Sequence, residues 1–124
     1  MVGMRVHAVP FPPDIGDLTS VTQLFQALGD PTRVLLLLAL QQGEQAVSDL
    51  VTQLAQPQST VSRHLGVLRH AQLVQTRRDG TRVLYRLADS HLGDLLIQAF
   101  SHAEHRRLGL ADHHLTDRLS GGVH

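Results

Sequence analysis

Four side chains that can bind a metal ion lie in one segment near the C-terminus: Asp89, His91, His102 and His105. In a helix, at 100° per residue, the three histidines would fall within a stripe about 60° wide. His102 and His105 are close enough along such a helix to bind one ion together. His91 would lie roughly 16 Å from His102 along the axis. One copy of this helix therefore cannot complete a metal site.

A second copy of the helix, packed antiparallel across a two-fold axis, would remove that distance. Asp89 and His91 of one chain would then meet the two later histidines of the other, twice per dimer. Three imidazoles and a carboxylate form a complete ligand set for a divalent transition metal. A neighbouring apolar stripe suits burial and consists of Leu92, Leu96, Ala99, Phe100 and Ala103. The alternative is a surface helix that is merely rich in histidine.

Composition narrows the possible chemistry. The chain has 124 residues and no cysteine, which excludes disulfides and thiolate metal sites. A net charge of zero argues against indiscriminate nucleic-acid binding but permits a local basic patch. The longest apolar run, Val34 to Leu40, is too short to span a bilayer, and no signal-peptide pattern opens the chain. We therefore expect one cytoplasmic domain that gains stability from dimerisation.

The remaining pattern predicts mainly helices. Residues 1–16, with three prolines and His7, should form an extended arm, and residues 17–107 the folded domain. Residues 108–124 should form an irregular, histidine-containing tail. Four helices are predicted before the metal-binding segment: Leu18 to Leu28, Pro31 to about Leu40, Val47 to Leu54, and Pro57 to about Ala71. The second is nearly all apolar and should be the buried centre of the domain.

The third and fourth predicted helices, joined by the short turn Ala55-Gln56, have the order of a helix-turn-helix. In the fourth helix Val61, Leu65 and Leu68 share one side and should anchor it in the core. Small polar side chains and an arginine near its N-terminal end could enter a major groove: Gln58, Ser59, Thr60, Ser62, Arg63 and His64. An ordinary solvated helix face would also fit this pattern.

A basic hairpin should follow this helix. Leu73 to Arg78 and Arg82 to Leu87 flank Asp79-Gly80, a dipeptide favoured in two-residue hairpin turns. Arg77, Arg78 and Arg82 would cluster near its tip, where they could contact backbone phosphates. A solvated charged turn is the alternative. The order of elements favours a winged helix-turn-helix, mainly α with a small β-hairpin, that binds double-stranded DNA.

These segments resemble the ArsR/SmtB family of metal-sensing bacterial repressors from about Leu18 to His114. ALGDPTRVLLLLAL resembles the second helix of the family, STVSRHLGVLRHAQLV its recognition helix, and RRDGTRVLYRL its wing. Asp89 and His91, with the two later histidines, match the interhelical metal site of the family. The segment HAEHRRLGLADHH further resembles the nickel/cobalt-sensing branch.

The resemblance implies a homodimer whose apo form binds operator DNA and whose metal-bound form releases it. It also implies that Glu104, His113 and His114 could extend the ligand set, which would favour nickel or cobalt over zinc. Two positions depart from the family pattern. Gln72 stands where a glycine is usual, so the recognition helix should be capped less comfortably. Arg107 stands where some nickel sensors have another histidine.

Two other function classes remain as alternatives. A metallohydrolase could also use three histidines and a carboxylate, but four protein ligands leave no open position for water and no general base is evident. A DNA-binding protein could use the histidine-rich helix only as a dimer interface, with a response to pH. We expect a regulator and not an enzyme. Its expected partners are operator DNA and a second copy of the chain, with no membrane and no organic substrate.

Overall fold

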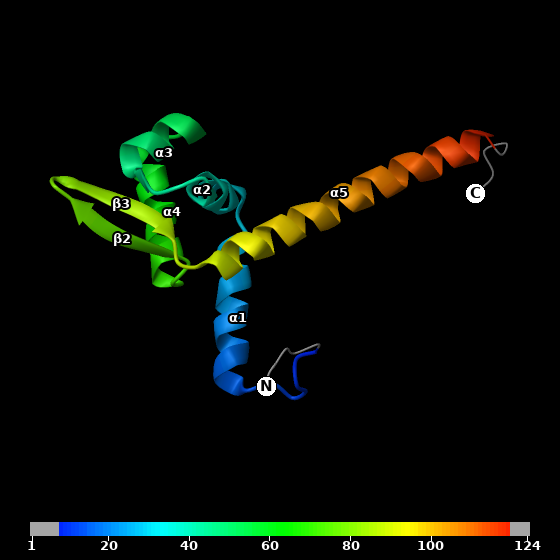
Figure 1. Ribbon diagram of the computed structural model, residues 1–124, viewed down its shortest axis with the longest axis horizontal. Helices are drawn as coiled ribbons and strands as arrows, with labels where there is room; N and C mark the ends of the chain where they lie inside the picture. The colour runs from blue at the N-terminus through cyan, green and yellow to red at the C-terminus, as the bar shows by residue number, and fades with distance from the viewer. Residues whose placement is uncertain (1–7, 120–124) are drawn as a thin grey trace.

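The computed structural model describes residues 8–119 of the chain, with side chains described for residues 8–109. The elements follow in this order: α1 (Ile15–Leu28), α2 (Pro31–Gln41), β1 (Gln45–Ala46), α3 (Val47–Leu54), α4 (Gln58–His70), β2 (Val74–Asp79), β3 (Arg82–Leu87) and α5 (Ser90–Leu119). The first four helices and the sheet form a body from which α5 extends as a long arm (Figure 1). The predicted arrangement of helices followed by a hairpin is confirmed.

Helix α2 lies at the centre of the core. Asp30 caps its N-terminus by accepting hydrogen bonds from the backbone N–H groups of Thr32 at 2.8 Å and Arg33 at 3.2 Å. Pro31 occupies the first position, where a missing N–H leaves no hydrogen bond unmade. The buried side of the helix carries Leu36, Leu37, Ala39 and Leu40. The sequence-based prediction of a buried central helix is therefore confirmed.

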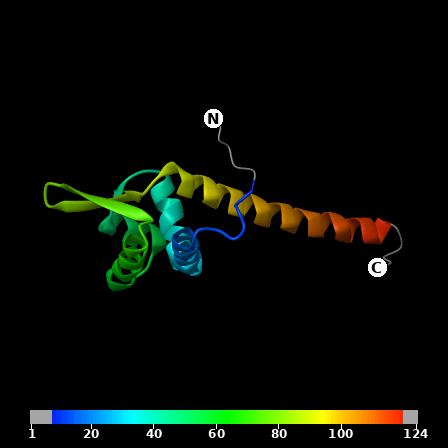
Figure 2. The ribbon, with the colours of Figure 1, turned by 90° about the horizontal axis from the view of Figure 1, so that it is seen from below.

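Helices α3 and α4 form the predicted helix-turn-helix. Figure 2 shows α4 nearly end-on. Helix α3 has the predicted bounds, and α4 is one residue shorter at each end than expected. Val61, Leu65 and Leu68 are completely buried, as their shared helix face predicted. They fix which side of α4 faces the core and therefore which side faces solvent.

The end of α4 is a Schellman motif built on Gln72. Its backbone φ is +63°, in the left-handed region that favours glycine. The N–H of Leu73 donates to the carbonyl of Leu68 at 2.9 Å, and the N–H of Gln72 donates to that of Arg69 at 3.0 Å. The expectation that this cap is less comfortable without glycine is consistent with that φ value.

The sheet is antiparallel with strand order β1-β3-β2. Asp79 pairs with Arg82, so the two-residue loop is Gly80-Thr81 and not the expected Asp79-Gly80. Gly80 has φ +65°, as the first central residue of a type II′ turn requires. Strand β1 was not predicted, because two residues are too few to show an alternating pattern.

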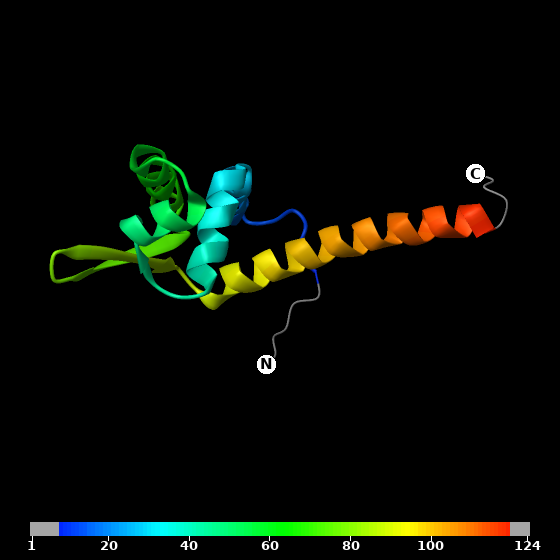
Figure 3. The same cartoon turned by 90° about the horizontal axis from the view of Figure 1, so that it is seen from above.

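Helix α5 differs most from expectation. The segment after His105 is helical through Leu119, so the predicted irregular tail is wrong for those residues (Figure 3). A lone glycine such as Gly109 weakens a helix by only about 1 kcal/mol and need not end it. At the other end of the chain, α1 begins at Ile15 with Asp14 as its cap, which shortens the expected arm. Within residues 8–119 no helix is long and apolar enough to cross a membrane.

Candidate functional site

The outer face of α4 presents most of the predicted DNA-contacting side chains to solvent. Gln58, Ser59, Ser62 and Arg63 are exposed, and Thr60 is half-buried. Because the three core anchors hold the opposite face, this polar face is free to approach a groove. Small hydroxyls and an arginine at the N-terminal end of such a helix can contact phosphates and base edges.

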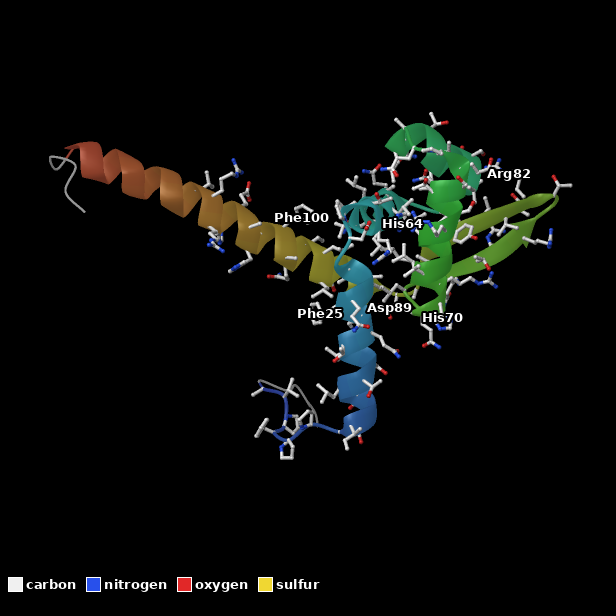
Figure 4. The ribbon with its side chains drawn as sticks, turned by 180° about the vertical axis from the view of Figure 1, so that it is seen from behind. Phe25, His64, His70, Arg82, Asp89 and Phe100 are labelled. Atoms are coloured by element: carbon white, nitrogen blue, oxygen red, sulfur yellow. The ribbon has the colours of Figure 1, made fainter. Side chains whose placement is uncertain are left out.

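His64 does not belong to that face. It is only 5% exposed, and its Nδ1 lies 3.2 Å from Nη1 of Arg33 and 3.9 Å from Oδ1 of Asp30. Figure 4 shows the side chain between α4 and α2. The expectation that His64 contacts DNA is therefore corrected. His64 follows Val61 by three residues and precedes Leu68 by four, so it shares the buried side of the helix.

Two arginines of the wing, the hairpin β2–β3, are paired with acidic side chains. Arg77 donates from Nε and Nη2 to the two carboxylate oxygens of Glu44 at 2.8 and 2.7 Å. Arg82 donates from Nη2 to Asp49 at 3.2 Å, close to the start of α3 (Figure 4). Both arginine side chains remain more than half exposed. Neither carboxylate could be predicted as a partner, because each lies far from its arginine in the sequence. Arg78 is also exposed.

The bidentate pair shifts both ionisation equilibria. The hydrogen bond from Arg77, helped by its charge, holds the pKa of Glu44 below its ordinary value of 4.5. The same carboxylate raises the pKa of the Arg77 guanidinium. Both partners of this pair are therefore charged at neutral pH, and Glu44 neutralises one positive charge of the wing.

The candidate metal ligands lie along the exposed side of α5. Asp89 caps the helix by accepting a hydrogen bond from the backbone N–H of Leu92 at 3.1 Å. His91 Nδ1 lies 3.8 Å from Oδ1 of Asp89, and both side chains are exposed. His102, Glu104 and His105 are also exposed. Among the side chains described, no three His, Cys, Asp or Glu residues come together as a metal site within one chain.

For His113 and His114 the structure describes the backbone only. His113 and His114 lie in the helical part of α5 beyond the last described side chain, and His7 lies outside the described residues. Along a continuous helix, eight residues separate His105 from His113 by about 12 Å. They can join an ion at His105 of the same chain only if the helix after it unwinds.

An apolar surface lies beside the candidate ligands, where α1 meets α5. Phe25 and Phe100 are each at least half exposed and border this junction (Figure 4). A shallow groove of about 350 Å³ is lined by Phe25, Leu28, Val34, Leu96, Ala99, Phe100 and Ala103. Leu18, Val21, Leu35 and Ile97 are further exposed apolar side chains on α1, α2 and α5. Such a contiguous patch is typical of a protein interface.

The fold and the polar face of α4 define a winged helix-turn-helix DNA-binding protein. Residues 30–76 match the family described as bacterial regulatory protein, arsR family. The chain is 42% identical over 114 residues to the HTH-type transcriptional regulator KmtR of Mycobacterium tuberculosis. The aligned residues make up 92% of this chain and 84% of that protein. The chain belongs to the ArsR family of bacterial transcriptional regulators.

Solved structures agree with that assignment. A homodimeric winged helix-turn-helix DNA-binding domain from Mycobacterium bovis superposes with a TM-score of 0.70 at 31% identity, over 78% of this chain and 90% of that one. The solution structure of apo-NmtR superposes with a TM-score of 0.63 at 36% identity, over 85% and 87%. The chain is thus a transcription regulator and not an enzyme, as the sequence predicted.

Proposed function

We propose that this protein is a homodimeric, metal-responsive repressor. It binds operator DNA through α4 and the wing, and it releases that DNA when a divalent metal ion binds between two copies of α5. One observation carries the proposal: exposed ligand pairs lie at two ends of one α5 segment, beside an unpaired apolar face. Neither pair is complete alone, and an antiparallel second copy would join them.

The dimer is supported by the position of the apolar residues. If His91 faces the partner's copy of His102, the two-fold axis passes between Leu96 and Ile97. Ile97 is 54% exposed and Phe100 is 50% exposed in the single chain, and both would lie at the centre of the interface. A buried apolar centre with polar ligands at its edges is a common interface arrangement. The homodimeric state of the similar M. bovis domain supports the same assembly.

The donor set fits a divalent transition metal. Asp89 uses one carboxylate oxygen for the helix cap, which leaves the other oxygen for an ion. The exposed imidazole of His91 would bind beside it, and His102 and His105 of the second copy would complete the set. When bound, the ion would supply a rigid crosslink between the two protomers. Four nitrogen and oxygen ligands suit zinc or cobalt.

Nickel or cobalt is the preferred ion because further ligands lie close by in sequence. Glu104 is exposed, and its Oε2 lies 3.9 Å from Nη2 of Arg107, so it could be recruited without loss of a strong ion pair. His113 and His114 would raise the coordination number toward the six that nickel favours. Their recruitment would need the helix after His105 to open. Zinc, bound by the four-ligand set, remains the alternative ion.

On the DNA side, the exposed residues of α4 would enter the major groove and the wing arginines would contact phosphates. Two such helices can occupy successive grooves only when they lie about 34 Å apart. An ion that fixes the relative orientation of the protomers can therefore change DNA affinity. Couplings of this kind are typically about 1 to 3 kcal/mol.

The decisive experiment mixes two variants that each lack part of the proposed ligand set. A His91→Ala protomer paired with a His102→Ala, His105→Ala protomer keeps all ligands in one of the two symmetric sites. We expect each homodimer to bind nickel or zinc weakly and the heterodimer to bind one ion tightly, as measured by calorimetry. A heterodimer that binds no better than its parents would show that the site does not span two chains.

Two substitutions test the DNA-binding surface. The affinity of each variant for DNA from upstream of the protein's own gene is measured by fluorescence anisotropy. Arg63→Ala should lower affinity and alter sequence preference. Arg78→Ala should weaken binding to all sequences and flatten the salt dependence by about one unit. Unchanged affinity in both variants would remove α4 and the wing as the DNA-binding surface.

A further inference from the structure

A partly buried polar cluster joins three helices behind the recognition face. The Arg33 guanidinium, at the start of α2, donates from Nε to the carbonyl of Ala27 at 2.6 Å and from Nη2 to that of Gln26 at 3.4 Å. Both carbonyls belong to the last turn of α1. Its Nη1 lies 3.2 Å from Nδ1 of His64 in α4. One side chain thus contacts α1 and α4 from the N-terminus of α2.

The chemistry of this contact is fixed by the donors. A guanidinium has only N–H donors, so Nδ1 of His64 must accept and the ring must hold its proton on Nε2. His64 is the buried polar side chain among residues 8–109, where an unmade hydrogen bond is expensive. Asp30 caps α2 and lies 3.9 Å from the same ring nitrogen, which places its negative charge beside the guanidinium.

Helices α1 and α2, two of the three helices in this cluster, both contact the proposed metal-binding helix α5. Phe25 and Leu28 of α1 line one groove together with Leu96 and Ala99 of α5. Figure 4 shows Phe25 and Phe100 at this junction, with His64 on the opposite side of α2 from the arm. A shift of α5 that moves the last turn of α1 would move two of the acceptors of Arg33. Its third contact is to the helix that presents the DNA-contacting residues.

We propose that Arg33 and His64 are positioning residues that couple the end of α1 to the recognition helix and so transmit metal binding to DNA affinity. This inference rests on the proposed function. A physical link with several directional hydrogen bonds moves α4 as a unit, whereas apolar packing alone would allow the helices to slide. The cluster is therefore required for the response to metal and not for metal binding itself.

The test compares two substitutions at His64. Asn places an amide oxygen near the position of Nδ1 and keeps an acceptor for Arg33. Leu has a similar volume and no acceptor. For each variant, DNA affinity is measured by anisotropy without metal and with saturating Ni²⁺ or Zn²⁺, and metal affinity is measured by calorimetry without DNA.

We expect metal to weaken DNA binding of the unaltered protein by about 5- to 150-fold. In His64→Leu this ratio should fall below about threefold, with metal affinity unchanged within about twofold; His64→Asn should keep most of the ratio. A purely structural role would lower DNA affinity equally with and without metal, leaving the ratio unchanged in His64→Leu, and that result would overturn the inference.

Arg33→Lys provides an independent variant if thermal unfolding shows that His64→Leu does not fold. Lysine keeps the charge but cannot span three acceptors. It should also reduce the metal-dependent ratio, and an unchanged ratio would overturn the inference. If neither metal changes the DNA affinity of the unaltered protein, the proposed function is overturned, and the inference with it.

Discussion

At the scale of single residues, several polar side chains have two tasks. Asp89 caps α5 and is a proposed metal ligand, whereas Glu44 and Asp49 pair with wing arginines that are also candidates for phosphate contacts. Arg33 and His64 contact one another, and Arg33 also holds two carbonyls of the last turn of α1. Substitutions at such residues are informative only when the two tasks are separated by the choice of replacement.

The two tasks of Asp89 can be separated with serine. Asp89→Ser keeps a capping oxygen but removes the carboxylate, so metal affinity should fall at least about tenfold while thermal stability stays nearly unchanged. Asp89→Ala should lose metal affinity and also about 1 kcal/mol of stability. Calorimetry and thermal unfolding of metal-free protein distinguish these effects. Full metal affinity in Asp89→Ser would remove this carboxylate from the ligand set.

Glu44 should restrain the wing. Glu44→Gln frees Arg77 for phosphate, so affinity for nonspecific DNA should rise and its salt dependence should steepen by up to about one unit. Anisotropy titrations at several salt concentrations measure both quantities. A lower affinity in Glu44→Gln would mean instead that the pair orients Arg77 for DNA.

The same residue gives a pH prediction. Because Arg77 lowers the pKa of Glu44 in the folded state, the pair stabilises the protein above the ordinary value of 4.5. That stabilisation should be lost as the pH falls below 4.5 and through the lower folded pKa. Denaturant unfolding of metal-free Glu44→Gln should therefore show a smaller acid-dependent loss of stability than the unaltered protein. Glu104→Gln provides a control at an exposed carboxylate of α5.

At the scale of elements, helix ends carry most of the local strain and most of the proposed movement. The cap of α4 at Gln72 should be improvable. Gln72→Gly relieves a left-handed φ of +63°, which is unfavourable by about 1 kcal/mol for a residue with a side chain. The midpoint of denaturant unfolding should rise accordingly, with DNA affinity retained. A loss of stability would show that the Gln72 side chain makes a compensating contact.

Opening of α5 after His105 should depend on Gly109. A Cβ at this position meets no atom within 4 Å, so Gly109→Ala fits without a clash and stiffens the helix by about 1 kcal/mol. If nickel recruits His113 or His114, this variant should bind nickel about fivefold more weakly and zinc as before. Calorimetry with both ions measures the difference. Equal nickel affinity would indicate that these histidines do not ligate, and zinc would become the preferred ion.

At the scale of the whole molecule, both proposed activities depend on the assembly of two chains. The apolar patch on α1, α2 and α5 is unpaired in one chain, and the ligand pairs are separated along the same helix. In the proposed dimer, the contact that buries the apolar patch would also complete the metal site. The same contact would set the distance between the two recognition helices of the proposed dimer.

Ile97→Asp tests this dependence directly. A charge at the centre of the proposed interface should raise the dimer dissociation constant at least about tenfold and weaken both metal and DNA binding. Val9→Asp, a similar change at an exposed apolar residue outside α1 and α5, is the matched control. Sedimentation velocity reports the oligomeric state. A dimeric Ile97→Asp protein would place the interface elsewhere.

The sequence alone determined the elements whose signals are local. The Asp30-Pro31 start of α2, the apolar spacing of Val61, Leu65 and Leu68, and the Asp89 cap each depend on residues within one or two turns, and the structure has all of them. The spacing of Asp89, His91, His102 and His105 likewise predicted a site that one helix cannot close. The structure places these residues on the exposed side of α5.

Only the tertiary structure decided what depends on contacts between distant segments. The ion pairs of Arg77 with Glu44 and of Arg82 with Asp49 join residues 33 positions apart. The partner of the buried His64 ring is Arg33 in another helix, and no periodicity within α4 can reveal that contact. The two-residue strand β1 forms only because β3 offers it a partner. Helix α5 continues past Gly109. One glycine weakens a helix by only about 1 kcal/mol, so its presence in the sequence does not determine where the helix ends.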